Sequence, residues 1–184
     1  MSGSQFDYAL NHFELFGLAP EFELDMQALE EAYRGLQARY HPDRHASGDA
    51  RDQREALQAA TRLNEAYRTL RDPRLRAGYL LGMAGIEFDA ERDTLQDPDF
   101  LMRQLELREA QEEAAQADDP IAALEGLHLR LRRERDAMIA AFAAHYAQGA
   151  FDTAKADVLR LSFYDRLCEQ LDEQLATLED AALD

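Results

Sequence analysis

Apolar residues recur every three to four positions along nearly the whole chain, which is the spacing of helices with one buried face. The segment 57–70 is a clear case, in which we expect Leu57, Leu63, Tyr67 and Leu70 to point inward together with Ala60. No segment alternates apolar and polar residues for long, and β-branched apolar residues, which favour strands, are scarce. The pattern therefore predicts an all-α protein.

Prolines and aspartates mark where the helices begin and end. Asp25 and Asp97 stand where N-caps are expected, and Pro98 follows at a first helical position that tolerates proline. We expect helices over 11–16, 25–40, 49–71, 73 to about 82–85, 98–117, 120–147 and 151–181.

The segment 84–96 breaks the helical spacing and is expected to be a connector. The short turns at Pro120 and Gly149 predict that the last three helices fold back on one another as an antiparallel bundle. The expected organisation is an N-terminal helical domain over 10–82, a connector over 83–97 and a three-helix bundle over 98–184.

Composition and charge exclude several kinds of function. The net charge of −17 argues against general nucleic-acid binding, which needs basic surface to neutralise phosphates. A single cysteine, Cys168, excludes an internal disulfide and a multi-cysteine metal site. No run approaches the roughly 18 apolar residues of a membrane span, and the first residues lack a signal-peptide pattern, so we expect a cytoplasmic protein without membrane association.

The loop after the second helix carries the most distinctive motif, His41-Pro42-Asp43. Proline ends the helix, and Arg34, Arg39 and Arg44 make its surroundings the most basic surface available in this acidic chain. Such a patch would steer an acidic partner towards the loop. By itself the tripeptide could be ordinary turn chemistry.

The wider context of that loop, YRGLQARYHPDRH at 33–45 and AYRTLRDPRLRAGYL at 66–80, resembles the J domain, and FELFGL at 13–18 resembles its short first helix. The resemblance implies a helical hairpin that binds a heat-shock ATPase chaperone and stimulates its ATP hydrolysis. The implied chaperone-binding residues are His41, Pro42, Asp43, Arg34, Arg39 and Arg44.

The second half resembles the C-terminal domain of the HscB family in DFLMRQLELREAQEE at 99–113 and RLSFYDRLCEQLDEQL at 160–175. Membership implies a non-enzymatic co-chaperone of iron–sulfur cluster assembly, with an IscU-type scaffold as client and an HscA-type chaperone as ATPase. The implied scaffold-binding residues are Leu101, Met102, Leu105, Glu106, Arg108, Glu109 and Phe163.

A helical wheel indicates, independently of the family resemblance, which of these residues are exposed. At about 100° per residue, Leu101, Met102 and Leu105 share one side of their helix, and Phe100 and Leu107 share the opposite side. One side can pack in the bundle, and the other would then form an exposed apolar patch of the kind that binds partners. On the last helix, Phe163 falls about 160° from the centre of the apolar stripe and is expected off the core. The alternative is that Leu101, Met102 and Leu105 form the core of the bundle and that Phe163 packs under the J domain.

Three alternative functions fit the sequence less well. A J protein for general unfolded clients would more often carry a Gly/Phe-rich segment or a cysteine-rich zinc domain, and neither is present. A chain that binds the nucleotide itself would carry a Gly-rich phosphate loop, and a helical-bundle metalloenzyme would carry inward-facing Glu-x-x-His pairs; neither pattern is found. His41 and His45 stand four positions apart, but Pro42 breaks the helix between them and no further ligand is near, so we expect no metal and no cofactor.

Overall fold

The computed structural model describes residues 6–41, 50–87, 95 and 97–183 of the chain. Over these residues it contains seven α-helices and no strand, which confirms the predicted all-α class. The chain divides into two compact units, Met1–Ala84 and Gly85–Asp184. Each unit has its own buried core.

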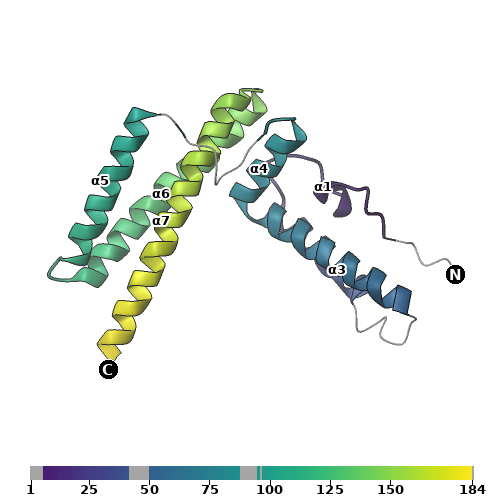
Figure 1. Ribbon diagram of the computed structural model, residues 1–184, viewed down its shortest axis with the longest axis horizontal. Coiled ribbons are helices and arrows are strands. Elements are labelled where there is room, and N and C mark those ends of the chain that lie inside the picture. The colour runs from purple at the N-terminus through teal and green to yellow at the C-terminus, as the bar shows by residue number, and fades with distance from the viewer. Residues whose placement is uncertain (1–5, 42–49, 88–94, 96, 184) are drawn as a thin grey trace. The chain divides into compact units, whose positions relative to one another are not determined.

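The first unit contains four helices (Figure 1): α1 over His12–Leu15, α2 over Met26–Tyr40, α3 over Ala50–Arg71 and α4 over Pro73–Met83. The helices α1, α2 and α4 all pack against α3, which is the longest of the four. Their large buried side chains form one core made of Phe13, Leu29, Leu63, Leu70, Leu80 and Leu81.

Local capping explains where these helices begin. The Asp25 carboxylate accepts hydrogen bonds from the backbone amides of Gln27 and Ala28, and Asp72 does the same for the amide of Leu75. These bonds satisfy amides that have no partner within the helix. The predicted starts of α2 and α4 are therefore confirmed.

One inward residue of the first unit was predicted wrongly. Leu57 is 59% exposed, whereas its neighbour Ala56 is buried and leads a stripe that continues through Ala59, Leu63 and Ala66. Leu57 lies about 100° around the helix from Ala56, outside this stripe. The first half of α3 buries small alanines, and the larger leucine is left in solvent.

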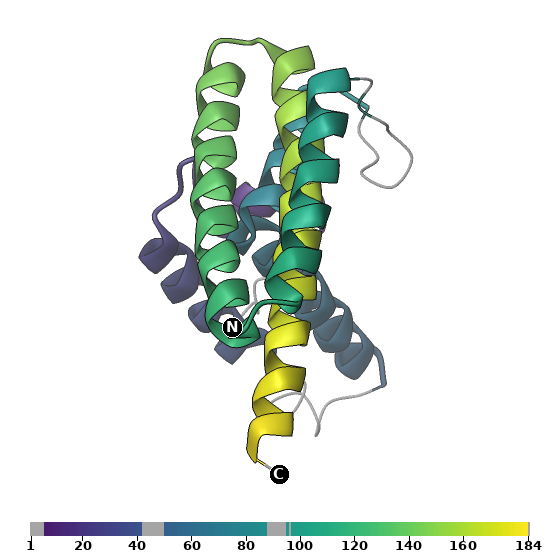
Figure 2. The same ribbon diagram turned by 90° about the vertical axis from the view of Figure 1, so that its left-hand side faces the viewer.

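The second unit is a bundle of three long helices, α5 over Pro98–Ala115, α6 over Pro120–Ala147 and α7 over Phe151–Leu183. Figure 2 shows them side by side with alternating direction, as predicted. The most extensive packing is between α6 and α7, and α5 packs along this pair. The core contains Phe100, Leu107, Leu124, Leu127, Leu131, Phe163, Tyr164, Leu167, Cys168 and Leu171.

Capping and turn geometry again explain the boundaries of the bundle helices. Asp97 caps α5 and Asp119 caps α6, and a proline follows each of them at the first helical position. Gly149 has a φ of 71°, a left-handed conformation that costs glycine little, and it closes the turn between α6 and α7. Within the described residues, no helix is both long enough and apolar enough to span a bilayer.

Candidate interaction surfaces

The predicted chaperone-binding residues fall at and beyond the end of α2. His41 is the C-cap residue, with extended backbone angles (φ −62°, ψ 128°) and an exposed side chain. Pro42, Asp43 and Arg44 lie outside the described residues. The structure therefore places the start of the His-Pro-Asp motif where α2 ends, and the rest of the motif stays a prediction.

The two arginines predicted on α2 are both exposed, but their surroundings differ. The Arg34 guanidinium makes an ion pair with Glu30, one turn earlier on the same helix. Arg39 lies over the ring of Tyr40, with 5.3 Å between the guanidinium carbon and the ring centroid. Glu30 thus offsets part of the positive charge of α2, and the basic surface is weaker than the residues from 32 to 42 alone indicate.

A set of aromatic contacts fixes α2 against α3. The rings of Tyr33 and Tyr67 stack with centroids 4.0 Å apart, and the Tyr33 hydroxyl donates a hydrogen bond to Asn64 Oδ1 at 2.8 Å. Closer to the end of α2, the Tyr40 ring contacts the Phe6 ring edge-on. These contacts hold the helix that leads into the motif.

Arg76 has a structural role. It is 7% exposed, its Nη1 donates to the carbonyl oxygen of Leu70 at 2.5 Å, and its guanidinium lies over the ring of Phe22. Burial lowers the pKa of this guanidinium, and the nearby Asp72 carboxylate opposes that effect. The side chain therefore satisfies a carbonyl at the end of α3 and ties α4 to it.

The helix α5 has the two apolar sides that the helical wheel predicts. Phe100 and Leu107 are 8% and 1% exposed and face the core. Leu101, Met102 and Leu105 are 50%, 59% and 56% exposed. We call these three residues the α5 patch. They are not core residues of the bundle, so the alternative that they form its core is wrong.

The polar residues predicted around the α5 patch are exposed as well. Glu106, Arg108 and Glu109 all have exposed side chains on the same helix. Glu106 accepts a hydrogen bond from Nη1 of Arg103 at 3.0 Å, and so one carboxylate beside the patch has a defined partner.

The prediction that Phe163 lies off the core is wrong. Phe163 is only 8% exposed, and its ring meets the ring of Phe100 edge-on with centroids 5.6 Å apart. On this part of α7 the four consecutive residues from Leu161 to Tyr164 are buried. The helix packs against both α5 and α6, and this buries more than one stripe of its surface. A contact between Phe163 and a scaffold stays a prediction, but little of its surface is available.

Sequence reasoning missed a polar cluster that joins all three bundle helices. Nη2 of Arg103 on α5 donates to Glu134 Oε1 on α6 at 2.6 Å, and the Tyr164 hydroxyl on α7 donates to Glu134 Oε2 at 2.8 Å. The hydrogen bond to Glu106, with smaller contributions from Tyr164 and Glu134, raises the pKa of Arg103, and burial raises the pKa of Tyr164. No local signal in the sequence indicates this cluster, because its members are at least 30 positions apart.

A second set of polar contacts lies at the end of the bundle where α6 turns into α7, and it connects α7 to the start of α5. Asp157, 3% exposed, accepts from Arg160 at 3.2 Å and lies 2.6 Å from Nδ1 of His145. Arg160 also donates to Asp97 at 2.7 Å, and this bond is the main reason why the pKa of the Asp97 carboxyl is below its usual range. The N-cap of α5 is thereby anchored to α7.

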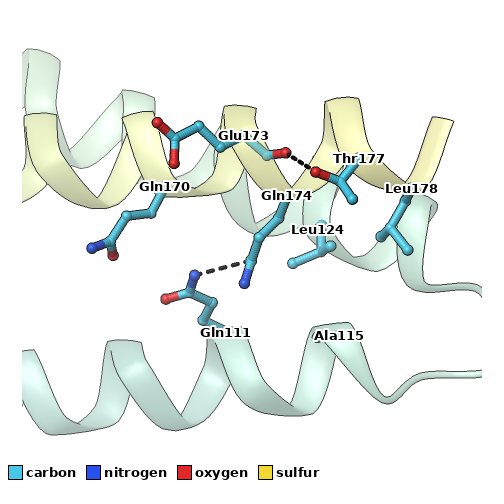
Figure 3. Close-up of a pocket in the computed structure, with 8 residues that line it drawn as sticks. All are labelled: Gln111, Ala115, Leu124, Gln170, Glu173, Gln174, Thr177 and Leu178. Carbon is cyan, nitrogen blue, oxygen red and sulfur yellow. Dashed lines mark hydrogen bonds between the residues drawn. The ribbon is translucent and has the colours of Figure 1, made fainter. Parts of the chain in front are cut away.

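The other end of the bundle contains a groove of about 660 Å³ between α5 and α7. Figure 3 shows its glutamine-rich walls, with Gln111 of α5 donating to Gln174 of α7 at 3.0 Å, and Leu124 of α6 beside them. Its lining holds no cluster of catalytic side chains. Across the described residues, no group of three or more His, Cys, Asp or Glu residues is placed to hold a metal ion.

In comparison with known proteins, two family models match this chain, one in each of its two compact units. Residues 11–79 match the family model of the DnaJ domain, and residues 96–172 match that of the HSCB C-terminal oligomerisation domain. The chain is 43% identical over 169 residues to a protein of Burkholderia multivorans and 45% identical over 170 residues to one of Ralstonia nicotianae, each named co-chaperone protein HscB homolog. Both alignments cover 92% of this chain and 96% of the relative.

Solved structures give the same result. The chaperone HscB from Vibrio cholerae is 38% identical, with a TM-score of 0.83 over 92% of this chain and 99% of that one. The human co-chaperone HscB has a TM-score of 0.84 over 91% of this chain and 83% of its own. At 24% identity, that second likeness concerns the fold alone.

Proposed function

Because this chain belongs to the HscB family of J-domain co-chaperones, we propose that it brings an iron–sulfur scaffold protein of the IscU type to a heat-shock ATPase of the HscA type. It stimulates ATP hydrolysis by that ATPase and has no active site of its own. It works in the cytoplasm. The first unit contacts the ATPase and the second unit contacts the scaffold.

The proposed ATPase contact rests on the end of α2. His41 leaves the helix in an extended conformation with its imidazole exposed, and Arg34 and Arg39 are exposed on the same helix. Pro42, Asp43 and Arg44 complete this contact in the proposal. Positive charge around the loop would speed the encounter with an acidic surface more than it would tighten the final complex.

The scaffold contact rests on the α5 patch, and this is the observation that carries the proposal. Three large apolar side chains, each at least 50% exposed, lie within five positions of one another on a helix whose opposite side is buried. Water contact with such a cluster is unfavourable, and a partner that covers it gains free energy. Glu106, Arg108 and Glu109 are the proposed polar rim, and Phe163 remains a candidate only at its exposed edge.

The proposal is tested by measuring the ATPase rate of an HscA-type chaperone with this protein, in the presence and absence of an IscU-type scaffold. We expect stimulation by the protein alone and a larger stimulation with the scaffold. Leu101→Ala and Leu105→Ala should remove most of the scaffold-dependent increase and leave the basal stimulation. Interfaces concentrate their energy in a few apolar anchors, whose truncation costs about 2 kcal/mol or more.

Leu129→Ala is the matched control. Leu129 is 54% exposed on α6 and lies outside the α5 patch, so the same substitution there should leave the scaffold effect unchanged. Equal stimulation by the scaffold and by a permanently unfolded polypeptide would favour a general unfolded-protein client instead. No stimulation of the ATPase under any condition would refute the proposal as a whole.

A further inference from the structure

The helix α5 is held to the bundle by a narrow apolar seam. Its buried residues are Phe100, Leu107 and Ala114, one in every seven, and Ala110 packs partly buried against the same core. By contrast, α7 buries four consecutive residues in its middle. A straight helix drifts only about 20° per seven residues, so these three residues form a single line along α5. A helix attached along one line can roll about its own axis more easily than one attached by two stripes.

Two polar contacts flank this seam on opposite sides. Arg103 lies about 60° to one side of Phe100 and reaches Glu134 of α6. Gln111 lies about 40° to the other side of Leu107 and reaches Gln174 of α7 (Figure 3). Contacts on both flanks resist rolling in either direction.

The contact made by Arg103 is the stronger of the two. It joins an arginine to a carboxylate at 2.6 Å, and both side chains are partly shielded, being 36% and 27% exposed. The Tyr164 hydroxyl holds the other oxygen of the same carboxylate, and Tyr164 is itself 4% exposed in the core. Charge-assisted bonds of this kind are roughly twice as strong as neutral ones. The Gln111–Gln174 bond is neutral and exposed.

Arg103 also lies within the turn that carries the α5 patch. It stands between Met102 and Leu105 in sequence, and its second nitrogen binds Glu106 at 3.0 Å. A single guanidinium therefore connects the core, through Glu134 and Tyr164, to a carboxylate beside the patch.

We propose that Arg103, Glu134 and Tyr164 are positioning residues that set the rotation of α5, and thereby present the α5 patch and Glu106 in the orientation that a scaffold protein binds. This rests on the proposed function of the patch. The three residues act through α5 and need not touch the scaffold. Without them the patch would still be exposed, but scaffold binding would first have to fix its orientation, which weakens affinity.

The test combines a measurement on the free protein with a measurement of binding. In Arg103→Met, hydrogen–deuterium exchange should speed up by about fivefold in the amides of α5 while the amides of α6 and α7 keep their rates. The Kd for an IscU-type scaffold, measured by calorimetry well below the melting temperature, should rise by about fivefold, which corresponds to about 1 kcal/mol.

Tyr164→Phe gives a second variant in which folding is not at issue, since the ring stays in the core and only the hydroxyl is lost. It should change both quantities in the same direction by about twofold, because Glu134 keeps its bond to Arg103. The matched control is Arg132→Met, an exposed α6 arginine two positions from Glu134 that makes no ion pair among the described residues. It should leave both quantities unchanged.

A purely structural role for the cluster predicts a different result. Hydrogen–deuterium exchange would rise equally in all three helices, and the scaffold would bind the folded variant with the wild-type Kd. Either finding would overturn the inference. Leu105→Ala in the same binding assay separates the two proposals. If neither the wild type nor this variant bound the scaffold, the proposed function would fail, and the α5 exchange rates would still decide whether the cluster positions the helix.

Discussion

Replacement of Phe163 by alanine and replacement of Leu105 by alanine should have opposite effects on stability and on scaffold binding. The family resemblance nevertheless places both residues on one scaffold-binding surface. Phe163 is 8% exposed and packs on Phe100 and Tyr164, whereas Leu105 is 56% exposed. The perturbations are Phe163→Ala and Leu105→Ala. The first removes a ring from the core, and the second removes a side chain that is largely in water.

The magnitudes follow from these environments. Removal of a buried phenylalanine ring typically costs about 3–5 kcal/mol, because burial is lost and a cavity remains. An exposed leucine on a helix should change stability by no more than about 0.5 kcal/mol, since alanine is an equally good helix former. For a unit of roughly this size, each kcal/mol moves the melting temperature by about 4–8 °C. Phe163→Ala should therefore lower it by at least about 12 °C, and Leu105→Ala by less than about 4 °C.

Differential scanning calorimetry of the full chain measures both changes. The transition of the second unit should shift in Phe163→Ala, and that of the first unit should not. Scaffold affinity supplies the second axis, because Leu105→Ala should bind at least tenfold more weakly while keeping its melting temperature. A small shift for Phe163→Ala, or a large one for Leu105→Ala, would refute the assignment of Phe163 to the core and of Leu105 to the surface.

Three further outcomes are expected. His41→Gln should abolish stimulation of the ATPase with helicity and scaffold binding unchanged, and full stimulation would reduce the motif to a turn. Burial lowers the pKa of His12 below its ordinary value of 6.5. The unfolded chain therefore takes up a proton at His12 more readily than the folded chain does. The first unit should accordingly lose stability as the pH falls below about 6.5. His12→Phe should flatten that part of a plot of melting temperature against pH; an unchanged slope would assign it to other groups. Cys168 is buried and burial raises the pKa of its thiol, so it should react with a thiol reagent only after denaturation, and rapid reaction of the native protein would contradict this.

The sequence alone determined the helices and, to within about two residues, their ends. Asp25 and Asp97 cap helices through bonds to amides two or three residues away, and such bonds form regardless of how the helices later pack. The two apolar sides of α5 were also predictable, because the angle between Phe100 and Leu105 is a property of the helix itself. The exposure of the α5 patch then followed, since the side with Phe100 and Leu107 was the one that entered the core.

Only the tertiary structure decided which helices bury more than one stripe and which polar groups meet. A helical wheel centred on one stripe placed Phe163 outside the core, but α7 faces two neighbours and Phe163 meets α5. In α3 a rotation of about 100° separates Ala56 from Leu57, and the fold buried the smaller and less hydrophobic of the two. The partner of Arg103 was equally hidden, because a chain with this many acidic residues offers many candidates and only the fold brings Glu134 within reach.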